Sequence, residues 1–151
     1  MTRIYIDTEF SDFTEKQLIS FAAVAEDGQE FYVELDPLPP SVSDFVLSHV
    51  LPLLEGGFRQ IQRDKFKERF AAWVSQFNDP ILISDSGWDL SMVRSGFGLA
   101  PTHEMGILNY FDLCLTLVVI PALSEEAEEL FTETLMQYFV TDPRQHHALV
   151  D

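Results

Sequence analysis

The segment at residues 3–13, RIYIDTEFSDF, is the part of the sequence that most restricts how the chain can fold. Its apolar and β-branched residues are typical of a buried strand, yet Asp7 and Glu9 stand in the middle of it. Side chains two positions apart on a strand point to the same face, with Cα atoms roughly 6.5 to 7 Å apart. We therefore expect the two carboxylates to lie side by side.

Two carboxylates at this spacing repel each other, so either one is protonated or a cation lies between them. Hard divalent ions prefer carboxylate oxygens, which makes Mg²⁺ or Mn²⁺ a suitable counter-charge for Asp7 and Glu9. The alternative is that the strand lies at the edge of a sheet, with both acids in water.

Three strands are predicted at the start of the chain, at residues 3–8, 18–25 and 29–35, which are rich in Ile, Val, Phe and Tyr. Asp27-Gly28, between the second and the third, is a strong signal for a tight hairpin. The chain is therefore expected to open as a three-stranded antiparallel meander.

Two helices are predicted after this meander. Apolar residues follow a helical period from Ser41 to Leu53, and Ser41 and Asp44 form a possible capping box at its start. His49 lies on the apolar stripe, so we interpret it as a hydrogen-bonded core histidine rather than a ligand. A longer helix is predicted at roughly residues 59–78.

The second half of the chain mixes strands and helices. Residues 81–84, ILIS, predict a short buried strand, and residues 89–97, DLSMVRSGF, predict a helix. LNYFDLCLTLVVI, at residues 108–120, is interpreted as a strand followed by a helix that Asp112 caps. Residues 124–139 predict a further helix with acids in its first turns. This order predicts an α/β fold with a mixed sheet and helices packed against it.

Length and composition indicate one soluble domain over residues 1–151, because 46% hydrophobic residues suffice for one core. The single cysteine, Cys114, excludes an internal disulfide and is expected to be a buried, inert thiol. The N-terminus resembles no leader peptide, and the longest apolar run is about half the ~20 residues that a membrane span needs. We expect a cytoplasmic protein with no membrane partner.

Charge separates the chain from ordinary nucleic-acid-binding proteins. A formal net charge of −16 repels polyanions and membrane surfaces and attracts cations. The distribution is uneven, since five of the nine basic residues fall within eleven positions: Arg59, Arg63, Lys65, Lys67 and Arg69. We expect these residues to cover the solvent side of an amphipathic helix, or alternatively to form a basic edge that contacts a polyanion.

Two further positions carry candidate chemistry. Asp89 follows a buried strand at the beginning of the next helix, where ligands often collect, although a plain acid at a helix N-terminus is the alternative. HHALVD, at residues 146–151, places His146 and His147 close to Asp151. On a continuous helix His146 and Asp151 would be about 140° apart, so they could flank a site without sharing a face.

IDTEF, GWDLSMV and HHALVD resemble, in this order, the three motifs of the DEDDh superfamily of 3'-5' exonucleases. The third matches the H-x-A-x-x-D form through His146, Ala148 and Asp151. These enzymes have a ribonuclease H-like fold that also opens with a three-stranded meander. The sequence is most similar to their compact bacterial exoribonuclease-like branch, over essentially the whole chain.

The resemblance implies that Asp7, Glu9, Asp89 and Asp151 bind two Mg²⁺ or Mn²⁺ ions and that His146 is the general base. The implied reaction hydrolyses the terminal phosphodiester of short or single-stranded RNA and releases nucleoside 5'-monophosphates from a free 3' end. A 3'-5' DNA exonuclease and a non-catalytic domain of the same fold are the alternatives. The resemblance also suggests a possible homodimer.

Several residues remain open within this interpretation. His147 is a rival for the general base, Phe10 is either a base-stacking residue or a wall of the core, and Trp88 is expected to pack rather than to contact substrate. Asp85 stands where relatives often carry Asn, and adds negative charge near the expected metal site. The sequence ends at Asp151, so the domain is expected to end within or just before its last helix.

Overall fold

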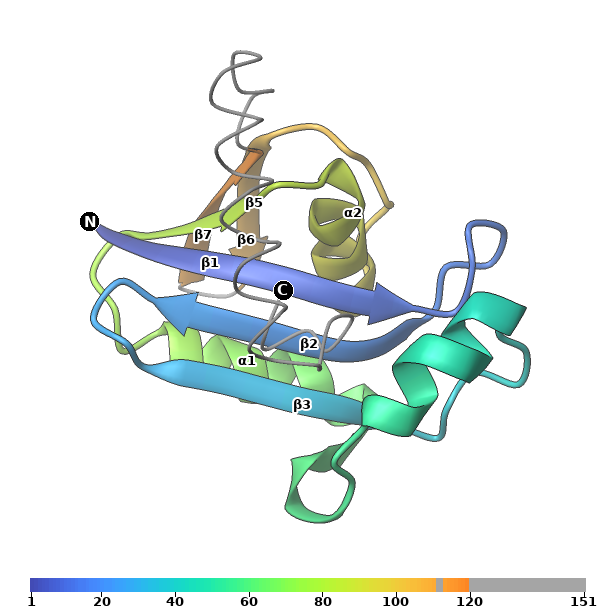
Figure 1. The fold of residues 1–151 in the computed structure, drawn as a ribbon. Helices are drawn as coiled ribbons and strands as arrows, with labels where there is room; N and C mark the ends of the chain where they lie inside the picture. The colour runs from blue at the N-terminus through green and yellow to red at the C-terminus, as the bar shows by residue number, and fades with distance from the viewer. Residues whose placement is uncertain (111–112, 120–151) are drawn as a thin grey trace, which may run out of the picture.

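A computed structural model describes residues 1–110 and 113–119 of the chain. They form a mixed seven-stranded sheet with the strand order β4-β3-β2-β1-β5-β7-β6 (Figure 1). The strands are β1 (Thr2–Phe10), β2 (Leu18–Ala25), β3 (Glu30–Asp36), β4 (Gln60–Gln62), β5 (Pro80–Ser84), β6 (Gly106–Tyr110) and β7 (Leu113–Val119). The α-helices are α1 (Phe66–Val74) and α2 (Gly87–Gly96). The α/β class and the mixed sheet are as predicted.

The opening meander is confirmed. β1 pairs antiparallel with β2, and β2 pairs antiparallel with β3. Gly28 turns the second hairpin with a φ of 86°, a left-handed conformation that glycine adopts without strain. On its other side β1 pairs parallel with β5, so β1 lies in the middle of the sheet. The edge-strand alternative for Asp7 and Glu9 is therefore wrong.

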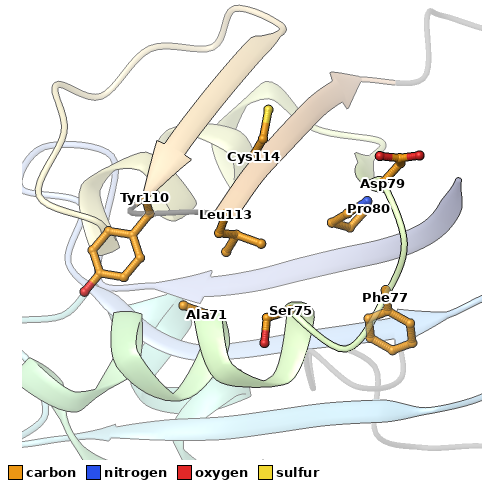
Figure 2. Close-up of a pocket in the computed structure, with 8 residues that line it drawn as sticks. All are labelled: Ala71, Ser75, Phe77, Asp79, Pro80, Tyr110, Leu113 and Cys114. Atoms are coloured by element: carbon orange, nitrogen blue, oxygen red, sulfur yellow. The ribbon is translucent and has the colours of Figure 1, made fainter.

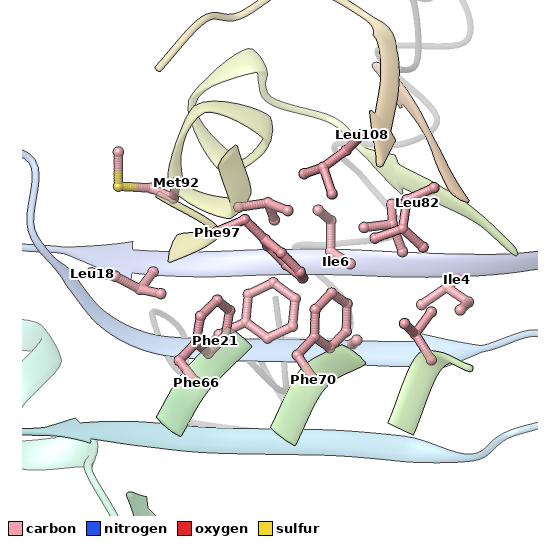
Figure 3. Close-up of a cluster of buried hydrophobic side chains, with 14 of the residues drawn as sticks. Ile4, Ile6, Leu18, Phe21, Phe66, Phe70, Leu82, Met92, Phe97 and Leu108 are labelled. Carbon is pink, nitrogen blue, oxygen red and sulfur yellow. The ribbon is translucent and has the colours of Figure 1, made fainter. Parts of the chain in front are cut away.

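One face of the sheet carries the core. The inward side chains of β1, β2 and β5 pack with those of both α-helices in a single cluster (Figure 3). Phe70 of α1 is fully buried, and its ring centroid lies 4.6 Å from that of Phe21 on β2. Truncating a ring packed in this way costs about 3 to 5 kcal/mol. α1 and α2 cover the same face of the sheet, and Ile4 and Ile6 of β1 point toward them. Since side chains alternate along a strand, Asp7 and Glu9 point to the opposite face.

The two predicted middle helices are shorter than expected. In place of the helix predicted from Ser41 to Leu53, the structure has a π-type segment, Val46–Val50, followed by a 3₁₀ turn, Leu51–Leu53. Ser43, not Ser41, supplies its hydroxyl, which accepts a hydrogen bond from Val46 N at 3.2 Å. Val46 and Val50 are the residues of this segment that face inward, so His49 is exposed and stacks on Phe45, 4.7 Å between ring centroids. Its interpretation as a core histidine is wrong.

The helix predicted at 59–78 is limited to α1 because its first residues are used elsewhere. Gln60–Gln62 pairs with β3 as the parallel strand β4, and 3₁₀ turns flank it at Gly57–Arg59 and Arg63–Lys65. Arg63 Nη1 donates to Leu18 O at 2.8 Å. Tertiary pairing to the sheet thus overrides the local helical pattern.

The helix predicted after Asp112 is also wrong. Leu113–Val119 is the strand β7, which pairs with β5 on one side and with β6 on the other. Leu115 and Leu117 point into the core, so the intervening positions point outward and Cys114 is exposed. The expectation that the Cys114 thiol is buried is therefore wrong for the same reason: side chains in this segment repeat every two residues, as in a strand, and not every 3.6, as in a helix.

Other expectations fall on residues outside the described part of the chain. These are Asp112, the helix predicted at 124–139, and the third motif at 146–151. Among residues 1–110 and 113–119, no helix is long and apolar enough to cross a bilayer.

Candidate functional site

Asp7 and Glu9 share one face of β1, as the spacing predicts. Both are half-buried. In the register with β2, Asp7 lies opposite Ala22 and Glu9 opposite Ser20. The ladder between β1 and β5 ends at the pair Tyr5 and Ile83, so both acids lie beyond it. The strands that follow β1 in the chain lie on one side of it, up to β4, and β5 lies on the other side. Ligands characteristically bind at such a topological switch point, at the carboxyl ends of the parallel strands.

Asp89 reaches the same end of β1 from α2. Ser86 caps this helix by accepting a hydrogen bond from Trp88 N at 3.1 Å, which places Asp89 in the first turn. The Asp89 carboxylate is only 3% exposed. Thr8 Oγ1 donates to its Oδ1 at 2.6 Å, and Ser84 Oγ donates to its Oδ2. Hydroxyls from β1 and β5 therefore hold both carboxylate oxygens.

The electrostatics of Asp89 are those of a buried acid. The pKa of Asp89 is raised to about 6, chiefly by burial and also by the charge of Asp85, while hydrogen bonds from Ser84 and Thr8 lower it in part. Within residues 1–110 and 113–119, no basic side chain forms an ion pair with Asp89. Such a group is stabilised in its charged form by a metal ion.

The three candidate acids approach β1 from two sides. Thr8 points to the helix-covered face, where it meets Asp89, while Asp7 and Glu9 point to the opposite face. Accordingly, the described ranges contain no group of three or more His, Cys, Asp or Glu side chains that could hold a metal ion. His146 and Asp151, which the resemblance assigns to the same site, lie outside the described residues.

An aromatic cluster borders the site where β1 ends. The ring of Phe13 lies 5.4 Å from that of Phe10 and 5.5 Å from that of Trp88, between centroids. Trp88 also contacts His103 at 3.9 Å, and the ammonium of Lys16 lies 4.7 Å from the Trp88 ring. Phe13 is 69% exposed. Phe10 and Trp88 thus belong to one partly exposed wall beside Asp89.

Phe13, Lys16 and His103 of this cluster were not among the residues predicted from the sequence. The first two lie in the loop at residues 11–17, and His103 lies in the segment between α2 and β6. Neither segment has a hydrophobic period, and only the exposed aromatic Phe13 could have drawn attention to the loop.

The loop at residues 11–17 is fixed by its own hydrogen bonds. Ser11 N donates to Gln17 O at 2.9 Å, and Gln17 N donates to the buried Ser11 Oγ at 3.0 Å. The Asp12 carboxylate accepts from the backbone N–H groups of Thr14 and Glu15. These backbone bonds lower the pKa of Asp12. These bonds therefore fix the backbone course of the loop.

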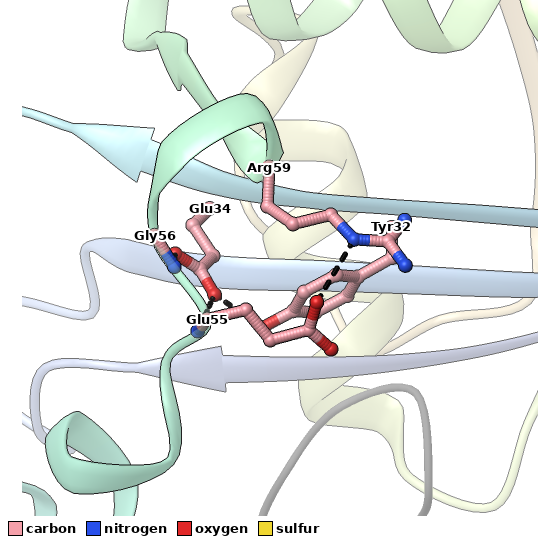
Figure 4. A network of polar contacts seen from close by, with 5 residues as sticks. All are labelled: Tyr32, Glu34, Glu55, Gly56 and Arg59. Atoms are coloured by element: carbon pink, nitrogen blue, oxygen red, sulfur yellow. Dashed lines mark hydrogen bonds and ion pairs between the residues drawn. The ribbon is translucent and has the colours of Figure 1, made fainter.

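A second buried acid, Glu34, has a structural role (Figure 4). It is 1% exposed and accepts hydrogen bonds from Glu55 N at 2.6 Å, Gly56 N at 2.9 Å and Tyr32 Oη at 3.0 Å. Burial raises the pKa of Tyr32, and the charge of Glu34 raises it further. Arg59 pairs with Glu55 at 3.1 Å, so this network ties the 55–59 loop to β3.

The basic segment divides into two groups. Arg59 and Arg63 are half-buried and make intramolecular contacts, which the solvent-face expectation did not foresee. Lys65, Lys67 and Arg69 are exposed, as that expectation requires. The accessible positive charge of the segment therefore lies on and just before α1.

A cavity of about 520 Å³ lies far from these acids (Figure 2). Ser75, Phe77 and Pro80 line one side of it, and Tyr110, Leu113 and Cys114 line the other. It lies at the amino ends of β5 and β7, whereas Asp89 follows the carboxyl end of β5. Although it is large, this cavity is not the candidate catalytic site, because it lies at the other end of β5 from Asp89.

A scan against models of protein families found no match, and a search of curated proteins found no match either.

Proposed function

We propose that this protein is a metal-dependent 3'-5' exoribonuclease with a ribonuclease H-like fold. The observation that carries the proposal is the contact between Thr8 and Asp89, because it brings the carboxylate of the second motif against the strand that bears Asp7 and Glu9. The antiparallel meander, the parallel strand β5 beside it and the helices on the sheet are compatible with that fold.

The residues suit divalent ions in their chemistry. Hard cations take carboxylate oxygens, and an ionised carboxylate has about four acceptor positions, so the two hydroxyls on Asp89 leave acceptor positions for a metal. Asp7, Glu9 and Asp89, with Asp151 of the third motif, would hold the ions. Bound there, two ions would supply a nucleophilic water and charge stabilisation for the leaving oxygen. His146 would accept the proton of the attacking water.

The charge of the chain favours short substrates. A protein that contacts few phosphates gains little affinity from counterion release, and a net charge of −16 leaves few cations for such contacts. Short single-stranded RNA, held mainly at its 3' end, therefore suits this protein better than a long duplex. The choice of RNA over DNA follows from the resemblance to the exoribonuclease-like branch.

The experiment is digestion of 5'-labelled RNA and DNA pentamers of the same sequence with Mn²⁺ or Mg²⁺. We expect nucleoside 5'-monophosphates from RNA, released stepwise from the 3' end. Asp7→Asn should lower the rate at least a hundredfold, while Asp64→Asn, a matched change at an exposed acid, should leave it unchanged. A preference for DNA would overturn the substrate assignment.

Calorimetric titration with Mn²⁺ separates the enzyme from an inert domain of the same fold. We expect binding that Asp7→Asn weakens at least tenfold and Asp64→Asn does not. Absence of Mn²⁺ binding together with absence of products would identify a non-catalytic domain.

A further inference from the structure

We infer that the groove between the loop at residues 11–17 and α2 binds the sugar-phosphate backbone of single-stranded RNA, with Lys16 as the phosphate contact. This inference rests on the proposed function and extends it. It concerns nucleotides upstream of the one that is removed, and it assigns a substrate-binding role to a residue outside the three motifs.

The groove consists of two adjoining cavities that share Lys16. One, of about 280 Å³, also has Arg63 in its lining, and the other, of about 230 Å³, has Trp88 and His103. Met92 and Ser95 of α2 line both cavities, as does Glu15 of the loop. Figure 3 shows Met92 at the same end of the core as Leu18, which lines the first cavity. Lys16 thus lies where the two cavities meet, and together they form a track beside α2.

Lys16 is held in an unusual backbone conformation at this junction. Its φ is 49°, in the left-handed region that a lysine rarely adopts. The hydrogen bonds between Ser11 and Gln17 close the loop around it. Strained residues of this kind persist where the surrounding structure fixes them, and they are concentrated at ligand-binding sites. The ammonium of this residue lies 4.7 Å from the centroid of the Trp88 ring.

The charge of Lys16 is available to a ligand. Its ammonium lies over the Trp88 ring and forms no ion pair with residues 1–110 or 113–119. An ammonium has three donors, and the ring face takes up only one side of it. Trp88 directly precedes Asp89 in α2, so the cation lies over the neighbour of the second-motif acid. A phosphate one or two nucleotides upstream of the scissile one fits this position.

Arg63 provides a second cation at the far end of the track. Two of its nitrogens donate to backbone oxygens, Nη1 to Leu18 O at 2.8 Å and Nη2 to Pro37 O at 3.0 Å. The guanidinium has five N–H donors, so these two bonds leave donors for a phosphate. Glu15 is the acid in the same lining, and its carboxylate accepts from Gln17 Nε2 at 3.3 Å. The expected footprint is therefore short, of about two phosphates.

The test compares a dinucleotide, which reaches only the catalytic acids, with a pentamer, which also reaches the groove. The variants are Lys16→Gln, Lys16→Arg and the control Lys67→Gln, which removes the same charge from an exposed position on α1. Hydrolysis of both RNAs is measured with Mn²⁺, and pentamer binding is measured by fluorescence anisotropy over a range of salt concentrations.

We expect Lys16→Gln to raise KM for the pentamer three- to tenfold and to leave dinucleotide hydrolysis within twofold of wild type. The slope of log K against log salt should fall by about 0.7, the value for one phosphate contact on a single strand. Lys16→Arg should stay within twofold of wild type on both RNAs, and Lys67→Gln should behave as wild type.

The results distinguish this inference from the proposed function. Equal pentamer kinetics and equal salt slopes for Lys16→Gln and Lys67→Gln, in an enzyme that hydrolyses both RNAs, would overturn the groove alone. Lys16-dependent pentamer binding without any hydrolysis would support the groove and overturn the exonuclease. Absence of both binding and hydrolysis would overturn both, and displacement of the RNA by an acidic peptide of equal length and charge would overturn the assignment of RNA.

Discussion

Thr8 Oγ1 donates a hydrogen bond to Asp89 Oδ1 at 2.6 Å, across 81 positions of the sequence. The contact joins the central strand to the first turn of α2 and is fully buried. It fixes where the helix begins relative to β1, and therefore how the second motif lies relative to the first.

Thr8→Val should destabilise the fold, because it keeps the shape of the side chain and leaves Asp89 with one hydroxyl donor instead of two. Loss of a buried hydrogen bond to a charged group costs about 1.5 to 3 kcal/mol. Urea unfolding at pH 8 measures this loss. Thr14→Val, the same change at an exposed position, should shift the midpoint little, and equal midpoints for the two variants would contradict the role of Thr8.

Asp89 should make stability fall as pH rises from about 4 to above 6. Its pKa is raised from 3.8 to about 6, so between these values the folded state binds more protons than the unfolded state. A shift of this size corresponds to about 3 kcal/mol, at roughly 1.36 kcal/mol per unit. The measurement is urea unfolding in EDTA from pH 4 to 8, for wild type and Asp89→Asn.

The difference between the two curves isolates Asp89 from the other carboxylates. Asp12 and Asp27 have lowered pKa values and act in the opposite direction, at pH values below about 4. We expect the difference to change through pH 4 to 6 and to be flat above pH 7. A difference that is flat over the whole range would contradict the raised pKa.

Glu34→Gln should destabilise the 55–59 loop and the fold together. The carboxylate accepts from two backbone N–H groups and a phenol, whereas an amide offers one oxygen and an NH₂ group that faces donors. We expect the free energy of unfolding to fall by about 2 to 4 kcal/mol. A hydrogen bond to a charged group contributes about 1.5 to 3 kcal/mol, and the substitution weakens several such bonds without removing all of them. Thermal unfolding checks it, with Glu30→Gln, an exposed acid on the same strand, as the control.

Gly96→Ala tests the packing of α2 on α1. A Cβ at Gly96 would overlap the Phe66 ring, which is itself buried against Phe21 and Phe70. Overpacking costs about 1 to 3 kcal/mol, which exceeds the ~1 kcal/mol that alanine gains over glycine in a helix. We expect a net loss of stability in urea, whereas Ser95→Ala should have little effect. Stabilisation by Gly96→Ala would contradict this packing.

The parts of the fold that the sequence predicts well have unambiguous local patterns. The meander has strands rich in β-branched and aromatic residues and an Asp-Gly turn, and α2 begins at a capping Ser86 after a short apolar strand. The helix predicted at 113–119 is wrong because a short apolar run fits a strand and a helix equally well. Only its pairing with β5 and β6 decides between them.

The candidate site also has some residues that could be predicted from the sequence and others that could not. Asp7, Glu9 and Asp89 could be predicted because their motifs are short and local. Thr8 and Ser84 could not, since their role comes from a contact between β1, β5 and α2. The face that each acid takes was also beyond prediction, because the approach of α2 to β1 is set by packing of the whole core.

The most direct test is a crystal structure with Mn²⁺ and a nucleoside 5'-monophosphate, with the manganese located by its anomalous scattering. The account predicts manganese bound by Asp7, Glu9 and Asp89 at the carboxyl end of β1, with the nucleotide phosphate on the metal. Manganese bound only at other acids, with Asp89 still held by Thr8 and Ser84 alone, would contradict it.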